Sequence, residues 1–379
     1  MITGVLASIV YVVLGLSILV ILHELGHFIA AKWAGIKTEE FGIGYPPKAL
    51  KLFRKWQTDF TLNWIPFGGF VRMAGENLDP NAPVLAIKKG DFYSVSGFKR
   101  LVVIFAGVTV NLIFGVIVFS LVFFQTGIPQ ELKSPRVVEV VEDSPASKLN
   151  LTLPVEIVGF ELDGQLIKTE TVEAVQDLVA QHRGEDLTIV TTGKCEQMSC
   201  QDELIKNLIY LRLPEETPSE QGSLGIVFDQ MLWVRYPWYE MIWRSAVHGF
   251  NEALGLAGLI LNALGSVVTD AFHGKFQDQL AGPVGIVEQV HQAGVYRAGW
   301  QSWIYFVGML SVNLGLINIL PFPPLDGGKG IMTIAEWLIG RRRSLKIEHY
   351  LSYGGWFVLM ALIVGVTLRD IWRIADKFI

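Results

Sequence analysis

Four long runs of apolar residues constrain this chain more than any other feature. Each run is close to the roughly 20 residues that an α-helix needs to cross a bilayer, and the runs cover residues 1–22, 101–124, 299–325 and 350–368. Of the 379 residues only 18% are charged, against about a quarter in an ordinary soluble protein. We therefore expect an α-helical polytopic membrane protein with four transmembrane helices. A fifth run, residues 253–269, is shorter and is ambiguous by length alone.

The lysines and arginines indicate how these helices are oriented. One group flanks the segment between the first two runs, and a second group lies between the last two: Lys32, Lys37, Lys48, Lys88, Lys89, Lys99 and Arg100, then Arg341, Arg342, Arg343 and Lys346. By the positive-inside rule both segments are cytoplasmic. We then expect the N-terminus and residues 127–297 to lie outside the cytoplasm. The net charge of −5 and the lack of a sustained basic stripe give no indication of a nucleic-acid partner.

A metal-binding pattern, His23-Glu24-Leu25-Gly26-His27, follows directly after the first apolar run. Histidines four positions apart project from one face of a helix and can bind one zinc ion. The intervening glutamate can then accept a proton from zinc-bound water. Ionisable groups are costly in hydrocarbon, so their presence here requires a function. The alternative, a helix end that reaches the headgroups, leaves the spacing unexplained, but a bare H-E-x-x-H also occurs by chance and needs a third ligand elsewhere.

The third ligand is predicted at Asp326. Three prolines end the third apolar run just before it, at positions 321, 323 and 324. A broken helix at membrane depth is tolerated only where protein or trapped water satisfies its backbone. The alternative is an ordinary helix exit, where Asp326 would meet solvent.

The direction of the helices favours the metal site. His23 lies at the inner end of the first helix, about 30 Å from its outer end. Asp326 can reach the same ion only if the third main helix also runs inward. Residues 253–269 are therefore predicted not to cross the membrane and to lie along its surface instead.

Residues 135–214 have the pattern of a small soluble α+β domain. Strands are expected at residues 136–141, 187–190 and 208–213, a strand–turn–strand at 160–167 and a helix at 171–182. This order resembles a PDZ domain, which binds extended peptides; a generic α+β spacer is the alternative. Cys195 and Cys200 are expected to form a disulfide if this domain lies in an oxidising compartment, although two free thiols remain an alternative.

Both metal-site motifs resemble those of the site-2 protease family, in the branch that holds the bacterial regulator of sigma-E protease and its single-PDZ relatives. The first motif of that family matches His23, Glu24 and His27, and the second matches Asn318, Pro321, Pro323, Leu325, Asp326 and Gly327. Residues 282–286 are similar to the family's glycine-proline motif, and residues 66–73 to its membrane-dipping β-hairpin. The chain departs from the family at Val108, where proline is usual, and at Lys329, where histidine is common.

The resemblance implies an intramembrane zinc metalloprotease of a bacterial inner membrane. Its substrates would be single-pass transmembrane proteins, for example a pre-cleaved anti-sigma factor or remnant signal peptides. Glu24 would be the catalytic base, Zn²⁺ would be bound by His23, His27 and Asp326, and Asn318 would hold the substrate backbone. The segment with Gly68, Gly69 and Phe70 would dock the unwound substrate as an added strand, or it would serve only as an amphipathic anchor.

The expected segments follow from these assignments. Residues 1–36 form transmembrane helix 1 with the zinc motif, 37–98 a cytoplasmic and membrane-associated β-hairpin region, 99–126 transmembrane helix 2, 127–232 an inserted extracytoplasmic PDZ-like domain, 233–297 extracytoplasmic surface-lying helices, 298–327 transmembrane helix 3 with the third ligand, 328–349 a cytoplasmic basic loop, and 350–379 transmembrane helix 4 and a tail. Membrane lipid is the expected surrounding, and the sequence predicts no oligomeric state.

Three other functions fit the sequence less well. An ion transporter would also place His, Glu and Asp in the membrane, but it predicts inverted repeats that the two halves do not show. A non-catalytic scaffold has no need of a base such as Glu24. A membrane-anchored peptidase for soluble chains is disfavoured because the motif lies inside an apolar run.

Overall fold

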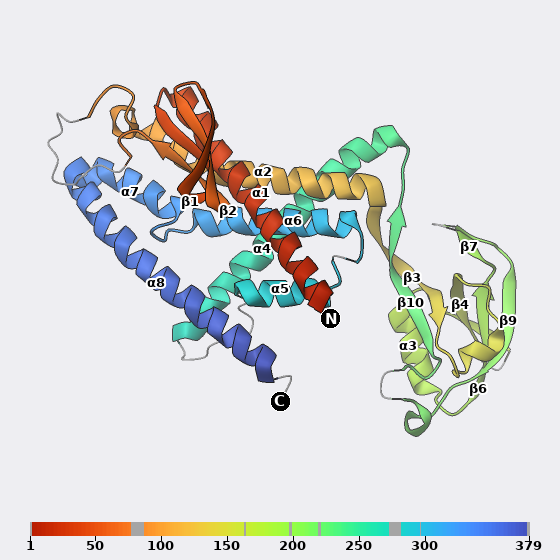
Figure 1. Ribbon diagram of the computed structural model, residues 1–379. Coiled ribbons are helices and arrows are strands. Elements are labelled where there is room, and N and C mark those ends of the chain that lie inside the picture. The colour runs from red at the N-terminus through yellow and green to blue at the C-terminus, as the bar shows by residue number, and fades with distance from the viewer. Residues whose placement is uncertain are drawn as a thin grey trace. The chain divides into compact units, whose positions relative to one another are not determined.

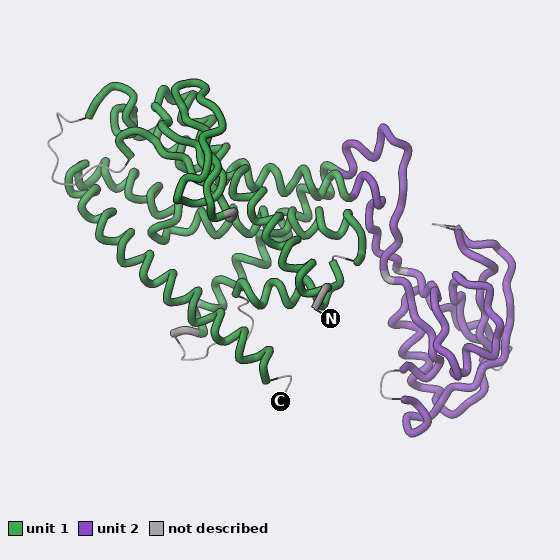
Figure 2. Tube along the Cα trace, viewed as in Figure 1, with its two compact units in different colours: residues 1–122, 246–379 green, residues 123–245 purple. Residues whose placement is uncertain are grey.

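A computed structural model describes residues 2–76, 87–162, 164–196, 199–218, 221–272, 282–295 and 297–376 (Figure 1). The chain divides into two compact units (Figure 2). The first, the helical unit, comprises Met1–Val122 with Ala246–Ile379, and the second, the inserted unit, comprises Phe123–Ser245. The insertion therefore leaves from the second long helix and returns through the third.

Long helices dominate the helical unit. They are α1 (Ile2–Ala34), α2 (Gly97–Thr126), α4 (Trp238–Phe272), α5 (Pro283–Gln292), α6 (Trp300–Ile319), α7 (Asp326–Ile339) and α8 (Arg341–Asp376). By length and composition, five helices in the described part of the chain could cross a membrane, namely α1, α2, α4, α6 and α8. Each of the four predicted apolar runs falls in a different one of these helices, and the fifth run lies in α4.

Residues 328–349, expected as a connecting loop, are largely helical. They form most of α7 and the first turns of α8. Gly340 separates the two helices with a φ of 80° and a ψ of 152°, a conformation that glycine adopts far more readily than other residues. The basic residues after Gly340 therefore begin a helix.

The helices α1 and α6 run in the same direction. Trp303 Nε1 donates a hydrogen bond of 3.2 Å to the carbonyl oxygen of Tyr11, and one turn further along both helices Gly15 faces Val307. The helix α2 runs the opposite way beside α6, because Gly308 of α6 faces Val118 and Gly315 faces Leu112. Glycine at these positions lets the helix backbones approach closely, as in other membrane bundles.

The helix α4 contacts the ends of α2 and α6 that lie beside the start of α1. The hydroxyl of Tyr305 in α6 donates a hydrogen bond to the Glu252 carboxylate, and Gly249 lies against Ser120 of α2. The chain then returns to the same end through α5. Here the Asp370 carboxylate of α8 accepts hydrogen bonds of 2.8 Å from the backbone amides of Gly282 and Gly285.

A two-stranded antiparallel sheet, β1 (Thr38–Lys55) and β2 (Thr58–Met73), follows α1. The strands curl so that Phe41 of β1 lies opposite both Val71 and Phe60 of β2. Residues 66–73, which resemble the membrane-dipping hairpin, form the last part of β2. The hairpin turn is at Trp56 and Gln57, whose positive φ values of 51° and 59° suit a tight turn between twisted strands.

The inserted unit is an α+β domain. Its elements are β3 (Ile128–Val140), β4 (Val155–Leu162), β5 (Gln165–Lys168), α3 (Val172–Gln181), β6 (Asp186–Thr192), β7 (Cys195–Glu196), β8 (Ser199–Cys200), β9 (Leu204–Tyr210) and β10 (Ile226–Val234). A six-stranded sheet has the order β10-β3-β4-β6-β9, with β5 paired to β4. The predicted strands overlap β3, β4, β5, β6 and β9, and the predicted helix overlaps α3. The strand expected at residues 208–213 begins earlier, at Leu204, and ends at Tyr210.

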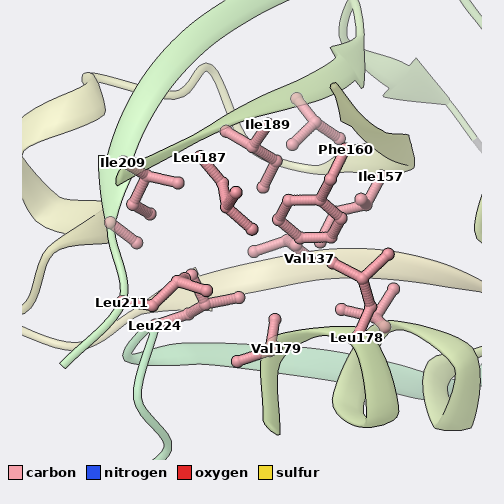
Figure 3. Packing of buried hydrophobic residues seen from close by; sticks show 13 residues of the cluster. Val137, Ile157, Phe160, Leu178, Val179, Leu187, Ile189, Ile209, Leu211 and Leu224 are labelled. Carbon is pink, nitrogen blue, oxygen red and sulfur yellow. The ribbon is translucent and has the colours of Figure 1, made fainter. Parts of the chain in front are cut away.

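The core of this unit lies between the sheet and α3 (Figure 3). Phe160 and Leu211 are fully buried there, and Val175 of α3 packs into the same cluster. The hydroxyl of Thr171 caps α3 by accepting a hydrogen bond of 3.2 Å from Ala174 N. Cys195 and Cys200 form a disulfide across the β7–β8 hairpin, in agreement with the predicted pairing.

Candidate metal centre

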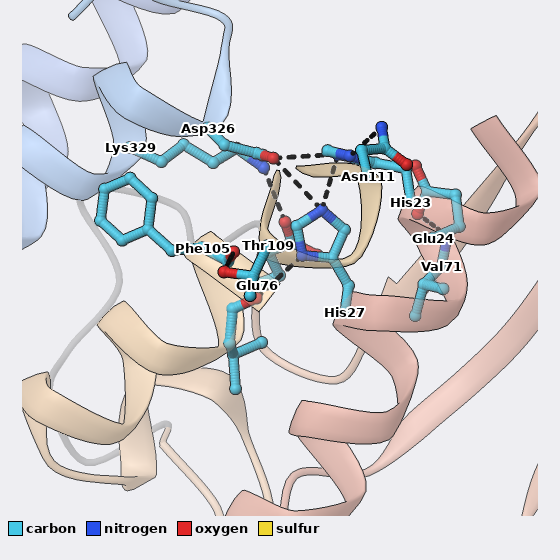
Figure 4. A network of polar contacts seen from close by, with 11 residues as sticks. His23, Glu24, His27, Val71, Glu76, Phe105, Thr109, Asn111, Asp326 and Lys329 are labelled. Atoms are coloured by element: carbon cyan, nitrogen blue, oxygen red, sulfur yellow. Dashed lines mark hydrogen bonds and ion pairs between the residues drawn. The ribbon is translucent and has the colours of Figure 1, made fainter. Parts of the chain in front are cut away.

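Three predicted ligands meet inside the helical unit (Figure 4). The Nε2 atoms of His23 and His27 on α1 are 3.1 Å apart. The Oδ2 atom of Asp326, the first residue of α7, lies 3.0 Å from the first of them and 3.3 Å from the second. Both histidines are buried, with 7% of their surface exposed. The α-helical spacing brings the two rings to one face of α1, and the reversal of the chain after α6 brings the carboxylate to them.

The geometry fits a zinc ion. Donor atoms that lie about 2.0–2.2 Å from a tetrahedral zinc ion are themselves about 3.3–3.6 Å apart, within a few tenths of an ångström of the three observed separations. Two unprotonated imidazole nitrogens and a carboxylate oxygen repel one another unless a cation lies between them. Two histidines and one carboxylate also form a ligand set typical of catalytic zinc, which leaves a fourth position open.

The helix α2 orients both imidazole rings. His27 Nδ1 donates to the backbone oxygen of Val103 at 2.8 Å, which leaves Nε2 with its lone pair. The side-chain amide of the fully buried Asn111 lies 3.3 Å from His23 Nδ1. The amide atom placed there is Nδ2. A flip of the amide exchanges Nδ2 and Oδ1; Oδ1 then accepts a hydrogen bond from Nδ1–H and leaves Nε2 of His23 free. Such partners on the second ring nitrogen are typical of metal-binding histidines.

Glycine permits the close approach of α2 and α7 to the ligands. A Cβ on Gly107 would lie 2.6 Å from His27 Nε2 and 2.8 Å from His23 Nε2, so a larger residue would displace the rings. Gly327 packs against the backbone oxygens of Ile319 and Leu320. Its missing side chain lets α7 start directly beside the end of α6, and this places Asp326 on a separate helix rather than at the end of the third long one.

Glu24 is held beside the ligands by the sheet. Its Oε2 accepts a hydrogen bond of 3.0 Å from the backbone N–H of Val71 in β2. Glu24 and the three ligands line a cavity of about 190 Å³. The described residues that complete its wall come from β2, the segment after it, α2, α7 and α8: Phe70, Val71, Met73, Glu76, Phe92, Tyr93, Ile104, Lys329, Thr333 and Glu348.

The other predicted site residues differ in their distance from the centre. Gly69 lies beside Glu24 and Ile21 of α1, and Phe70 lines the cavity. Gly68 precedes them with a φ of 72° and faces Tyr45. Asn318 is half-buried on the last turn of α6 and is not among the described residues that line the cavity.

Sequence reasoning assigned no role to Asn111, Gly107 or Val71. A signal existed for Asn111, since a polar side chain in the middle of an apolar run requires a partner. A second group of possible ligands, Glu156 with Cys195 and Cys200, lies in the inserted unit. Its sulfur atoms are joined in the disulfide and are therefore not available as thiolates.

The chain is similar to several bacterial proteins over almost its full length. A protein of Clostridium perfringens is 29% identical over 363 residues, which cover 96% of this chain and 98% of the relative. A protein of Rickettsia conorii is 28% identical over 96% of this chain and 98% of its own length. A protein of Brucella suis is 26% identical over 94% of this chain and 93% of its own length. Each relative carries the name "putative zinc metalloprotease".

A family match covers both units. Residues 11–362 match peptidase family M50, which confirms the resemblance to the site-2 proteases that the two motifs predicted. The match includes the helix with both histidines, the inserted unit and the turn with Asp326. This chain belongs to peptidase family M50 and is a zinc metalloprotease with several long apolar helices.

Proposed function

We propose that this protein is an intramembrane protease that hydrolyses peptide bonds within single-pass transmembrane segments. One observation carries the proposal. His23, Glu24 and His27 lie within α1, one of the helices that is long and apolar enough to cross a membrane, and Asp326 meets them there. Chemistry at this depth is directed at peptide bonds that are themselves in the bilayer.

A four-span topology is part of this proposal. The helices α1 and α6 run in parallel, so the end of α6 delivers Asp326 to the half of α1 that carries the histidines. The contacts of α4 with Ser120 and Tyr305 lie at the opposite end, and α5 returns the chain to that end. These contacts favour a helix α4 that stays on the outer side, with α1, α2, α6 and α8 as the spans.

His23, His27 and Asp326 are the proposed zinc ligands, and Glu24 is the proposed general base. When bound, zinc supplies the Lewis acidity that activates water and polarises the scissile carbonyl. Glu24 receives a proton and later transfers it to the leaving amine. The Val71 N–H holds the carboxylate of Glu24 on the cavity side of α1. Asn111 and Val103 hold the imidazole rings in the orientation that presents Nε2.

Substrate is proposed to dock along residues 69–73 of β2. This stretch pairs with β1 on one edge, and its other edge faces Glu24. An unwound peptide added to that edge would lie beside the base and the ligands. Asn318 is proposed to bind the substrate backbone as it enters from the α6 side. A Phe70→Pro variant should then lose turnover and keep its zinc, whereas undiminished turnover would refute docking at this edge.

The inserted unit is proposed to be an extracytoplasmic PDZ-like domain that selects which substrates enter. Its edge strands β9 and β10 offer places for an extended peptide. The disulfide between Cys195 and Cys200 suits an oxidising compartment outside the cytoplasm. A bacterial inner membrane, with the metal centre toward the cytoplasmic side, is the corresponding location.

The function is tested by co-expressing wild type or Glu24→Gln with tagged single-pass membrane proteins. Gln keeps the shape of the side chain and its hydrogen bond from Val71 but cannot accept a proton. We expect membrane-embedded fragments with wild type and none with the variant, at equal protein level and equal zinc content. Identical fragment patterns from both proteins would rule out proteolysis by this centre.

A further inference from the structure

Glu76 and Lys329 form an ion pair in the wall of the metal cavity (Figure 4). Lys329 Nζ lies 2.8 Å from Glu76 Oε1, and both side chains line the same cavity as His23 and Asp326. The glutamate side chain is 22% exposed and the lysine 39%. The proposed reaction assigns no role to either residue.

The ion pair joins two parts of the site that come from distant segments. Lys329 lies three positions after Asp326 on α7, and residues at this spacing share one face of a helix. Glu76 lies three positions after Met73, the last residue of β2. A backbone hydrogen bond stabilises the turn that carries Glu76: Phe92 N donates to the Ala74 oxygen at 2.7 Å.

These contacts close a ring around the cavity. On α1, His23 contacts Asp326 of α7 and Glu24 accepts the hydrogen bond from Val71 of β2. The ion pair then connects the end of β2 back to α7. Glu24 therefore contacts β2, Asp326 belongs to α7, and the pair of Lys329 with Glu76 joins the segment after β2 to α7.

We propose that Lys329 is a positioning residue, whose ion pair with Glu76 fixes the edge of β2 relative to Asp326. This inference rests on the proposed function of the same site. The ammonium does not act on the reacting atoms, because its charge is engaged by Glu76. Its effect is to keep Glu24 and a docked peptide in register with the ligands on α1 and α7. A half-buried, charge-assisted contact of 2.8 Å suits this role better than an exposed surface pair.

The kinetic test uses purified protein and a tagged single-pass reporter that wild type cleaves. Lys329→Met and Glu76→Gln should each lower kcat roughly 10- to 100-fold, the loss expected from a misplacement of about 1 Å. KM and zinc content should stay near the wild-type values. Lys329→Arg should retain most of the activity. The matched control is Lys51→Met, which removes a 2.7 Å ion pair with Asp59 in the same sheet and should leave kcat unchanged.

An exchange of charges separates positioning from direct catalysis. Glu76→Lys combined with Lys329→Glu restores an ion pair across the same gap, and the double variant should be more active than either reversal alone. A lysine that contacted the reacting carbonyl could not be replaced in this way. A double variant no better than the single reversals would overturn the proposal.

Hydrogen exchange supplies a readout that does not depend on proteolysis. The backbone amides of residues 69–73 should exchange faster in Lys329→Met than in wild type or Lys51→Met, with or without added zinc. Equal exchange in all three proteins would refute the positioning role even if activity had fallen. If wild type cleaves no reporter, the proposed function fails, and the exchange data still decide whether the ion pair holds β2.

Discussion

Asn111 of α2 lies 3.3 Å from His23 of α1, although 88 positions separate them in the chain. Asn111 is fully buried, and its backbone oxygen accepts a hydrogen bond of 2.8 Å from Ser311 of α6. A single residue of α2 therefore contacts the helix with both candidate histidine ligands through its side chain, and the helix that leads to Asp326 through its backbone.

Replacing Asn111 by Leu should weaken zinc binding about 10- to 100-fold, as the loss of a histidine's hydrogen-bond partner does in other zinc sites. Leu has a similar volume but cannot fix the tautomer and orientation of His23. Competition with a chelator of known affinity measures the change. Thr109→Val is the control, because Thr109 is exposed on the same helix and its hydroxyl donates to the backbone oxygen of Phe105 within that helix. Equal affinities for Asn111→Leu and wild type would contradict the orienting role.

Replacing Gly107 by Ala should displace both imidazole rings. The new methyl group would lie within 2.8 Å of each Nε2, so either the rings or α2 must move. We expect loss of zinc from the purified protein and loss of cleavage. Gly255→Ala makes the same change in α4, where a Cβ meets no atom within 4 Å, and should keep both properties. Metal content by elemental analysis is the measurement, and a fully zinc-loaded Gly107→Ala protein would be evidence against the close packing.

Removing zinc with a chelator should lower the thermal stability of the wild-type protein in detergent. A ligand that binds only the folded state stabilises it by about 2.7 kcal/mol at a free concentration of 100 times its Kd. The midpoint of unfolding should therefore rise again when zinc is restored. Asp326→Ala removes one donor and should show a much smaller zinc-dependent shift. The same shift in both proteins would mean that the ion binds elsewhere.

The Glu40→Gln variant should be less stable than wild type at neutral pH and equally stable in acid. Burial of Glu40 in β1 opposes ionisation, but the hydrogen bonds from Lys48 and Thr61 outweigh it and hold the pKa of this carboxyl below its usual value. A carboxyl with a lowered pKa in the folded state stabilises the protein above its unfolded-state pKa, and this stabilisation is lost as the pH falls through the folded-state value.

The test compares the free energy of unfolding of Glu40→Gln with that of wild type, at pH ~7 and at pH values below the unfolded-state pKa of about 4.3. The difference between the two free energies should shrink as the pH falls. A gap that stays constant over this range would show that the Glu40 carboxylate does not contribute through its charge. Glu39→Gln is a suitable control, because the Glu39 side chain is more than half exposed where it pairs with Arg72.

Local spacing along the chain was enough to predict the elements that depend on a short repeat. His23, Glu24 and His27 fall on one turn of a helix because of the α-helical repeat, and the apolar runs set the long helices. The strand pattern of residues 187–190 and the helical spacing of residues 171–182 similarly predicted β6 and α3. The prediction of Asp326 as a third ligand used the prolines just before it together with the direction of the third long helix.

Tertiary structure alone decided which distant segments complete the site. Nothing in the order of residues sets the register at which β2 passes α1, so neither the bond from Val71 to Glu24 nor the pair of Glu76 and Lys329 was foreseen. The turn between β1 and β2 at Trp56 and Gln57 was likewise not predicted. Such contacts depend on how helices and strands far apart in the chain pack together, and packing is a property of the whole folded unit rather than of any local pattern.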